Sequence, residues 1–558
     1  MVANVSQRTT DWNTINWRKA NRTVRNLRQR IFKASQKNNW KRVRSLQKLI
    51  MKSYSNTLIA VRRVTQINQG KNTPGIDKLL VKTPEARSCL VDILRKFIPW
   101  KPLPSKRIYI PKSNGKKRPL GIPSIIDRCL QAIVKSALEP FWEAKFEGCS
   151  YGFRPGRSTH DAIQKIFNTA RPSGNKKWIL EADIKGCFNE IDHGFLMGQI
   201  GNFPARKLIK EWLKSGFMED GIFHPTEAGT PQGGIISPLL ANIALHGMED
   251  WIGVKQPIGN SVRTPRILVR YADDFVVFCQ SKNDAEKAKQ EVEEFLKYRS
   301  LVFSEDKTRV IHIEEGFDFL GFNIRQYKDQ NSKSGNKLLI KPSKSNISKF
   351  RNQIRDIFKS CLGKEVVLLI AEINPKIRGW CNYYRHVVSS EIFNKLDRFI
   401  YHRCYRFARR THIHKSYGWL REKYWGISPL YPQSSSSFMD KTNGNTMLKM
   451  NSFNIKRHVM VKGRSSPDDP ELREYWKKRN KAGKVKYPSY LKVANNQKHI
   501  CPICRESLYN GESLHIHHRI PKAQGGKDTY GNLVLLHFYC HQQVHGNRQL
   551  FDRLSRMR

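Results

Sequence analysis

Apolar residues recur at helical spacing near the start of the chain, between residues 17 and 63. Leu27, Ile31 and Phe32 form one set, and Val43, Leu46, Leu49 and Ile50 form a second. Residues three and four apart share a helix face, so the pattern predicts two basic helices. The span nearly lacks acidic residues. That bias favours helices that face phosphate groups over ordinary solvated helices.

An alternating pattern follows at residues 106–124, which predicts a β-hairpin that turns at Asn114-Gly115. Its tip carries a cluster of lysine and arginine. Ser124 and Asp127 then have the spacing of a capping box, which predicts a helix that ends near Phe146.

Two short apolar runs, 176–184 and 266–280, are the best strand candidates because they are rich in branched and aromatic residues. Asp273 and Asp274 interrupt the second run. Two adjacent acids inside an apolar run indicate a tight turn with a strand on either side. A charged helix is predicted next, over residues 283–300.

The second half of the chain is helical, aromatic and basic from about residue 340 to 430, and its composition then changes. Segments rich in proline and serine connect this part to a compact module that begins near residue 491. We therefore predict five parts, with boundaries at residues 1–95, 96–335, 336–430, 431–490 and 491–558. The fourth part is expected to be a linker with a basic DNA-binding region.

The net charge of the chain indicates which class of partner it binds. The 558 residues include 100 Lys and Arg against 47 Asp and Glu, a net charge of +53, and 39% of residues are hydrophobic. A folded protein with such a surface attracts polyanions, so nucleic acid is the expected partner. A basic membrane-surface protein is the alternative, but no single amphipathic helix carries the charge.

The pattern of apolar residues does not predict a signal peptide or a membrane-spanning segment. The first twenty residues have no apolar core of a signal peptide, and no run reaches the ~20 apolar residues that cross a bilayer. We expect an intracellular protein without a membrane partner, cytoplasmic or nucleoid-associated in a bacterium or located in an organelle. Eight of its eleven cysteines are scattered, so disulfides are not expected.

The remaining cysteines are spaced like metal ligands. Cys501 and Cys504 are separated by two residues, and His537 and Cys540 repeat that gap. Two such pairs suit a tetrahedral ion, so a closed structural Zn²⁺ site of three cysteines and one histidine is predicted.

Three acids are candidates for phosphoryl transfer. Nucleotide addition uses two divalent ions about 4 Å apart, and Asp183 at a strand end with Asp273 and Asp274 on a turn could bridge them. An Asp-Asp pair on a turn is usually only a turn. The surrounding sequence therefore decides between these interpretations.

That sequence resembles the reverse transcriptases encoded by group II introns. YADD (271–274) and ADIKGCFNEIDH (182–193) are similar to the two catalytic segments of that family. Further blocks agree in order and spacing, namely KRPLGIP (117–123), YGFRPGRSTHDA (151–162), GTPQGGIISPLLANI (229–243) and FLGF (319–322).

The resemblance implies a multidomain α+β protein. Its fingers and palm would resemble those of a right-hand polymerase with an antiparallel palm sheet, followed by an α-helical thumb. Asp183 and Asp273 would then ligate two Mg²⁺ ions, and Asp274 would support the site. Phe188 matches the aromatic position that selects deoxynucleotides, although a plain core phenylalanine is the alternative.

Other matching positions would contact the nucleotide. Gln232 would lie against the incoming dNTP, and the adjacent glycines would permit close backbone approach. Lys112 and Arg118 on the basic hairpin would hold the triphosphate, since arginine offers a planar fork for phosphate oxygens.

The thumb segment is similar to the maturase region of the family, which binds intron RNA and promotes splicing. Aromatic and basic residues alternate within it and could stack on bases and neutralise phosphates. Packing between helices explains the same stripe equally well. The residues concerned are Arg378, Trp380, Tyr383, Tyr384 and Arg385.

Residues 515–545 resemble the HNH, or ββα-metal, nuclease motif. The resemblance implies that His518 is the general base and that Asn532 orients its ring. It also implies that His517, His541 and His545 hold one ion, Mg²⁺ or Mn²⁺. A zinc-stapled DNA-binding knuckle without cleavage is the alternative.

Together these resemblances predict a multifunctional protein. It would copy RNA into DNA from dNTPs, bind intron RNA and assist its splicing, and nick target DNA to prime synthesis. Two alternatives stay open at this point: a splicing maturase without retained catalysis, and a defence-type reverse transcriptase that serves no intron.

Overall fold

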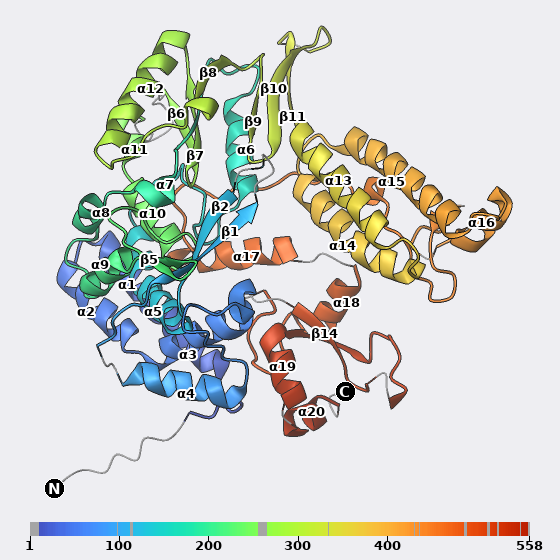
Figure 1. The fold of residues 1–558 in the computed structure, drawn as a ribbon, viewed down its shortest axis with the longest axis horizontal. Coiled ribbons are helices and arrows are strands. Elements are labelled where there is room, and N and C mark those ends of the chain that lie inside the picture. Colours follow the sequence, from blue (N-terminus) through green and yellow to red (C-terminus); the bar gives the residue numbers. More distant parts are fainter. Residues whose placement is uncertain are drawn as a thin grey trace.

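The computed structural model describes most of the chain, namely residues 10–96, 99–111, 115, 117–254, 265–332, 334–428, 430–434, 436–484, 488–509, 514–521, 524–546 and 548–555. Helices cluster around a central sheet in one half, a helical bundle extends to one side, and a small C-terminal module lies below (Figure 1). Among the helices in these ranges, none is both long enough and apolar enough to cross a membrane.

Three helices, rather than the two predicted, form the N-terminal region. They are α1 (Trp17–Gln36), α2 (Trp40–Met51) and α3 (Tyr54–Arg62). The apolar residues predicted for the first two are buried, except Leu49, which is 50% exposed. The third was missed because Tyr54–Arg62 continues the preceding apolar pattern after a break of only two residues.

These helices pack against α5 (Ile125–Glu143), which begins where the capping box predicted. The Asp127 backbone N–H donates to the Ser124 hydroxyl at 3.1 Å. Near α5 lie α4 (Pro84–Arg95) and the predicted hairpin, β1 (Ser105–Pro111) and β2 (Lys117–Ile122). The hairpin belongs to a sheet of order β2-β1-β4-β5, which β4 (Phe217–Glu219) and β5 (Ile222–His224) complete.

The central sheet contains both predicted apolar strands. Its order is β6-β7-β3-β8, with β3 (Trp178–Asp183), β6 (Ile267–Tyr271), β7 (Asp274–Cys279) and β8 (Arg309–His312) paired antiparallel. Leu180 and Val277 face one hydrophobic core, whereas Ile179 and Val276 face another. Both faces are therefore buried, which explains apolar runs in place of an alternating pattern.

Helices cover the two faces. On the first lie α8 (His193–Ile200), α9 (Arg206–Lys214), α10 (Ser237–Ala244), α11 (Met248–Trp251) and α12 (Lys282–Lys297). On the second lies α6 (Thr159–Thr169), whose Ile163 and Ile166 are buried. The short α7 (Cys187–Glu190) follows β3.

A second antiparallel sheet leads into the helical bundle. It has the order β11-β10-β9, with β9 (Phe317–Phe319), β10 (Phe322–Lys328) and β11 (Asn336–Pro342). The bundle consists of α13 (Lys344–Ser360), α14 (Val366–Tyr384), α15 (Ser390–Thr411) and α16 (Tyr417–Tyr424). Its apolar faces share one core with the adjoining face of the central sheet.

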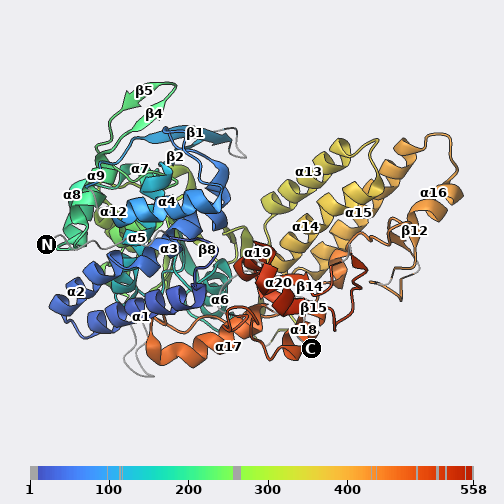
Figure 2. The same ribbon diagram turned by 90° about the horizontal axis from the view of Figure 1, so that it is seen from below.

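The chain then returns to the central sheet before it forms the C-terminal module. It passes through β12 (Trp425–Gly426), β13 (Ser437–Phe438) and α17 (Arg473–Lys484), which runs close to α1 and α6 (Figure 2). The module contains α18 (Pro488–Asn496), the hairpin β14 (Leu514–His518) and β15 (Leu533–His537), α19 (Phe538–Gly546) and α20 (Arg548–Ser555).

Candidate functional sites: a carboxylate cluster and two histidine and cysteine clusters

Three carboxylates meet at one end of the central sheet. Asp183 ends β3 and pairs in register with Asp274, the first residue of β7. Asp273 occupies the turn between β6 and β7, next to Ala272, whose φ is 59°. All three acids line a cavity of about 1450 Å³. Strand pairing thus brings together the acids that are separated by 90 residues in sequence.

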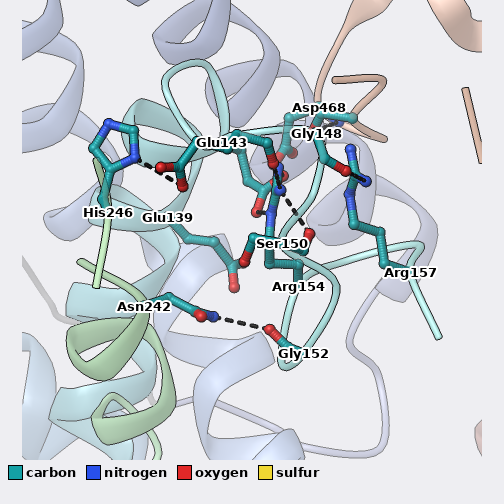
Figure 3. A network of polar contacts seen from close by, with 12 residues as sticks. Glu139, Glu143, Gly148, Ser150, Gly152, Arg154, Arg157, Asn242, His246 and Asp468 are labelled. Carbon is teal, nitrogen blue, oxygen red and sulfur yellow. Dashed lines mark hydrogen bonds and ion pairs between the residues drawn. The ribbon is translucent and has the colours of Figure 1, made fainter. Parts of the chain in front are cut away.

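The turn that carries two of these acids rests on Gly152. A Cβ atom at Gly152 would lie 2.4 Å from the Ala272 nitrogen, so only glycine fits there. The Asn242 side chain donates to the Gly152 carbonyl at 2.9 Å (Figure 3), and the buried Arg270 guanidinium donates to Asn242 at 3.1 Å. These contacts fix the position of the turn relative to the cavity.

The cluster has the electrostatics of a cation site. Burial, followed by the charges of Asp183 and Asp273, raises the pKa of Asp274 to about 7. Burial also raises the pKa of Asp273, with Asp183 contributing. Crowded carboxylates of this kind are stabilised by divalent ions, which prefer oxygen ligands. The donor set therefore fits Mg²⁺.

Lys307 is a residue of this site that the sequence did not reveal. Its ammonium forms an ion pair with the Asp183 carboxylate, and this hydrogen bond raises the pKa of Lys307 despite partial burial. The residue follows β3 by more than a hundred positions and stands among 100 lysines and arginines. Nothing in its local pattern separates it from the others.

The predicted nucleotide contacts lie beside the acids. Phe188 is buried, borders the cavity and meets the Phe153 ring edge-on at 6.1 Å between centroids. The Arg118 Nε donates to the Gln232 Oε1 at 3.0 Å. Gln232 in turn donates to Asn189 at 3.4 Å. Lys112 lies outside the described residues.

The aromatic residues Trp380, Tyr383 and Tyr384 of the bundle pack against other parts of the protein. Tyr383 and Tyr384 donate their hydroxyl hydrogens to the carbonyls of Leu320 and Gly321, at 2.9 and 3.1 Å. Trp380 packs against Tyr384 in a tilted arrangement, with 4.4 Å between the ring centroids. Packing within the protein therefore uses part of the surface of these rings.

Basic residues of the same stripe differ from one another. Arg385 donates to the Asn454 carbonyl at 3.0 Å, so it ties α14 to the following segment. Arg378 is half-buried. Tyr384 is buried among neighbouring rings, whereas Trp380 and Tyr383 keep part of their surface exposed, so their contact with nucleic acid stays a prediction.

The four predicted zinc ligands converge in the C-terminal module. One ligand atom from each of Cys501, Cys504, His537 and Cys540 lies within 4.8 Å of every other. His537 Nε2 donates to the Ser507 carbonyl at 3.1 Å, which leaves Nδ1 toward the thiols. Such an outer contact fixes the ring for metal binding. The set fits a closed tetrahedral ion.

A second cluster joins β14 to α19. His517, His541 and His545 each place a ring nitrogen within 4.8 Å of the others. Burial and neighbouring histidines lower the pKa of His517 and of His541 to about 4, so both rings are neutral at physiological pH. Among the described residues, the buried Nε2 of His517 has no hydrogen-bond partner. An unpaired acceptor among neutral imidazoles fits a divalent ion.

Among the described residues, no hydrogen bond joins Asn532 to His518, so the predicted orienting role of Asn532 stays a prediction. Its amide bonds to the backbone of Ile520 and Lys527, at 2.8 to 3.1 Å, and closes the loop between the strands. The His518 Nε2 instead meets the Asp528 carboxylate at 2.6 Å. Asp528 was missed because it stands in a turn, where an acid is ordinary.

Comparisons with known proteins agree with this arrangement. Four family profiles match: the N-terminal domain of reverse transcriptase (12–94), reverse transcriptase or RNA-dependent DNA polymerase (110–324), the group II intron maturase-specific domain (347–425) and HNH endonuclease (501–547). They occur in the predicted order, although the exact domain boundaries stay predictions.

Several relatives have similar sequences. Protein YkfC of Escherichia coli K12 is 34% identical over 48% of this chain and 80% of its own length. The group II intron-encoded protein LtrA of Lactococcus lactis is 32% identical over 54% of this chain and 63% of its own, so less than two thirds of LtrA is spanned. A 91 kDa protein in the cob intron of Schizosaccharomyces pombe is 27% identical over 86% and 68%. The chain therefore belongs to the reverse transcriptases encoded by group II introns, and it carries a maturase-specific and an HNH domain.

Proposed function

We propose that this protein copies RNA into DNA, binds intron RNA and assists its splicing, and nicks target DNA to provide a primer. The observation that carries the polymerase part is the carboxylate cluster. Asp183, Asp273 and Asp274 border one large cavity beside Phe188 and Gln232. Residues 96–335 would form fingers and palm, and 336–430 the thumb.

Asp183 and Asp273 would hold two Mg²⁺ ions, and Asp274 would support them. Such ions activate the primer hydroxyl and neutralise the triphosphate when bound. The raised pKa of Asp274 favours this assignment, because a divalent charge relieves the repulsion that raises it. Arg118 would contact the triphosphate, and its bond to Gln232 keeps the guanidinium at the cavity wall. Lys112 stays a prediction.

Phe188 would select deoxynucleotides. Its ring is 7% exposed and is held by Phe153, so it cannot move aside without opening the cavity wall. A ribose 2′-hydroxyl placed against this ring would lose space and hydration. Replacement by a smaller residue should admit ribonucleotides.

The helical bundle would bind intron RNA through its arginines, and the partly exposed rings of Trp380 and Tyr383 would add to that contact. Arg351, Arg355 and Arg403 lie 4.7 to 5.5 Å from the Phe399 ring. Burial and the nearby arginines lower the pKa of Arg403, a sign of mutual repulsion. Phosphates would relieve that repulsion. Arg378 of α14 would also contact the RNA.

The C-terminal module would cut one DNA strand. His518 would remove a proton from water, while Asp528 holds its ring. His517, His541 and His545 would hold one Mg²⁺ or Mn²⁺, which stabilises the leaving oxygen when bound. Zn²⁺ at Cys501, Cys504, His537 and Cys540 would be structural. A DNA-binding knuckle without cleavage would not need His518.

Two substitutions test the proposal and control for each other. Asp273→Ala should abolish primer extension on an RNA template while RNA affinity and DNA nicking persist. His518→Ala should abolish nicking while extension persists. Full extension by the first variant, or unchanged nicking by the second, would remove the corresponding assignment.

A splicing maturase without retained catalysis predicts a different result. Wild-type protein would then promote splicing of the intron RNA but would neither extend a primer nor nick DNA. The complete sets of three carboxylates and of histidines favour the catalytic alternative.

A further inference from the structure

Residues 456–479, here called the strap, join the helical bundle to the C-terminal module. The strap contains the first half of α17, and it runs back across the molecule beside α1 and α6 (Figure 2). The sequence suggested a linker with a basic DNA-binding region here. The contacts of the strap point to a further role.

Asp161 of α6 is the centre of the attachment. Its side chain is completely buried and has the capping-box bonds from Ser158. It also accepts hydrogen bonds from three groups of the strap, the His458 ring at 2.9 Å, the Val461 N–H at 2.8 Å and the Arg479 guanidinium at 2.7 Å. Despite burial, these donors lower the pKa of Asp161 to about 2. The carboxylate is thus charged and paired.

Two further contacts hold the middle of the strap. Asp468 accepts from the Arg28 guanidinium of α1 at 2.6 and 2.8 Å, and Arg157 donates to the Gly463 carbonyl at 2.6 Å. Figure 3 shows Arg157 and Asp468 in one polar network with Glu139, which also binds Arg28 at 2.8 Å.

A ring of the strap completes the attachment. Trp476 is buried and donates its indole N–H to the Ser466 carbonyl at 2.8 Å. It covers Gly156, where a Cβ atom would lie 2.5 Å from the Trp476 ring. Close packing and buried charge pairs make this attachment resistant to local opening.

Among the residues that the structure describes, the contacts of the C-terminal module with the N-terminal region are weaker. Glu506 faces Arg18 and Arg25 at 3.9 and 3.5 Å, and both arginines are more than 40% exposed. Gln66 meets Gln542 at 3.3 Å, and the Gln543 side chain donates to the Ile15 carbonyl at 3.3 Å. Exposed pairs of this kind contribute little to stability. The strap, not the face of the module, therefore determines how far the module can move.

We propose that the strap is a positioning device, with Asp161 as its anchor, which keeps the nuclease close to the polymerase cavity. A DNA strand cut by the module then has its 3′ end within reach of the carboxylate cluster. This proposal rests on the proposed function and deepens it, because it joins cutting and copying in one molecule.

The length of chain beyond the anchor gives the size of the effect. Pro488 lies nine positions after Arg479, and α17 includes the first five of the eight residues between them, so this segment spans at most about 30 Å. Release of the strap would extend the tether to the 32 residues from Lys456, and effective concentration falls as about the −3/2 power of tether length. The transfer of a cut end should therefore drop about sevenfold.

The test uses full-length protein with its intron RNA and the double variant His458→Ala/Arg479→Ala, which leaves α6 unaltered. The DNA is a labelled duplex that joins the sequences flanking the coding intron. Three quantities are measured: nicking, extension of a separately annealed primer, and the fraction of nicked strands extended in one turnover with unlabelled primer as competitor.

We expect the extended fraction to fall five- to tenfold, while nicking and separate extension change less than twofold. Asp161→Asn changes the acceptor of the same hydrogen bonds, and we expect the same fall in the extended fraction. Asp440→Asn is the matched control, since Asp440 is also buried but bonds only locally, to Thr442 and Asn443.

Hydrogen exchange over residues 456–479 reports release independently. An unchanged extended fraction in variants whose strap exchanges rapidly would overturn the positioning role. Unchanged exchange would overturn the claim that Asp161 anchors the strap. Wild-type protein that neither nicks nor extends would instead refute the proposed function itself.

Discussion

Replacement of Gly152 by alanine tests whether polymerisation depends on the exact position of the turn that carries Asp273 and Asp274. The added Cβ would lie 2.4 Å from the Ala272 nitrogen and 2.9 Å from the Tyr271 carbonyl carbon. Ordinary contact begins near 3.4 Å, so the turn that carries Asp273 and Asp274 must move by about 1 Å. Both neighbours are backbone atoms and cannot rotate away.

A displacement of that size is large for a metal site. Misplacement of reacting groups by about 1 Å can lower a rate about 100-fold. We therefore expect Gly152→Ala to reduce primer extension on an RNA template about 100-fold at saturating dNTP. Nicking by the C-terminal module should stay near the wild-type rate, since its histidines lie on other elements.

Gly198→Ala is the control for this variant. Gly198 lies in α8, and a Cβ there would meet no atom within 4 Å. Alanine is favoured over glycine inside a helix by up to about 1 kcal/mol, so this variant should extend primers normally and melt no lower than wild type. Extension by Gly152→Ala within threefold of wild type would refute the claim that Gly152 supports the turn.

Three further predictions concern other parts of the chain. Cys504→Ser should remove bound zinc, measured by mass spectrometry of the metal, and abolish nicking but not extension; retained stoichiometric zinc would contradict the ligand set. Asp528→Ala should slow nicking about tenfold by freeing the His518 ring, whereas an unchanged rate would show that the contact is incidental. Burial lowers the pKa of His386 to about 4, below the ~6.5 of an unfolded chain. Only the unfolded state then gains a proton as pH falls from 6.5 to 4, so stability should decrease by about 1 kcal/mol at pH 5.5. His386→Gln should flatten this dependence in thermal unfolding at pH 7.5 and 5.5, and an equal slope in both proteins would argue against it.

Motifs with a fixed spacing predicted the chemistry well. The YADD hairpin and the paired cysteine and histidine gaps are local signals, and the structure brings each set together. The central strands were also predictable, because burial on both faces leaves continuous apolar runs.

Contacts between distant segments could not be predicted in this way. Lys307 pairs with Asp183 across 124 positions, and Arg28 pairs with Asp468 across 440. Helical spacing places Trp380 and Tyr384 on one face but does not say whether protein or RNA covers that face. Asn532 matched a motif position, yet its hydrogen bonds are determined by the fold of the surrounding loop.

The junction between β15 and α19 joins the two candidate ion sites in one short segment. His537 ends the strand, Phe538 begins the helix, and the cysteine Cys540 lies beside His541. Loss of an ion from Cys501, Cys504, His537 and Cys540 would thus disturb the neighbouring His541 while leaving the distant carboxylate cluster intact. Under the proposed function, the protein without that ion would still copy RNA but would depend on DNA ends made by other enzymes.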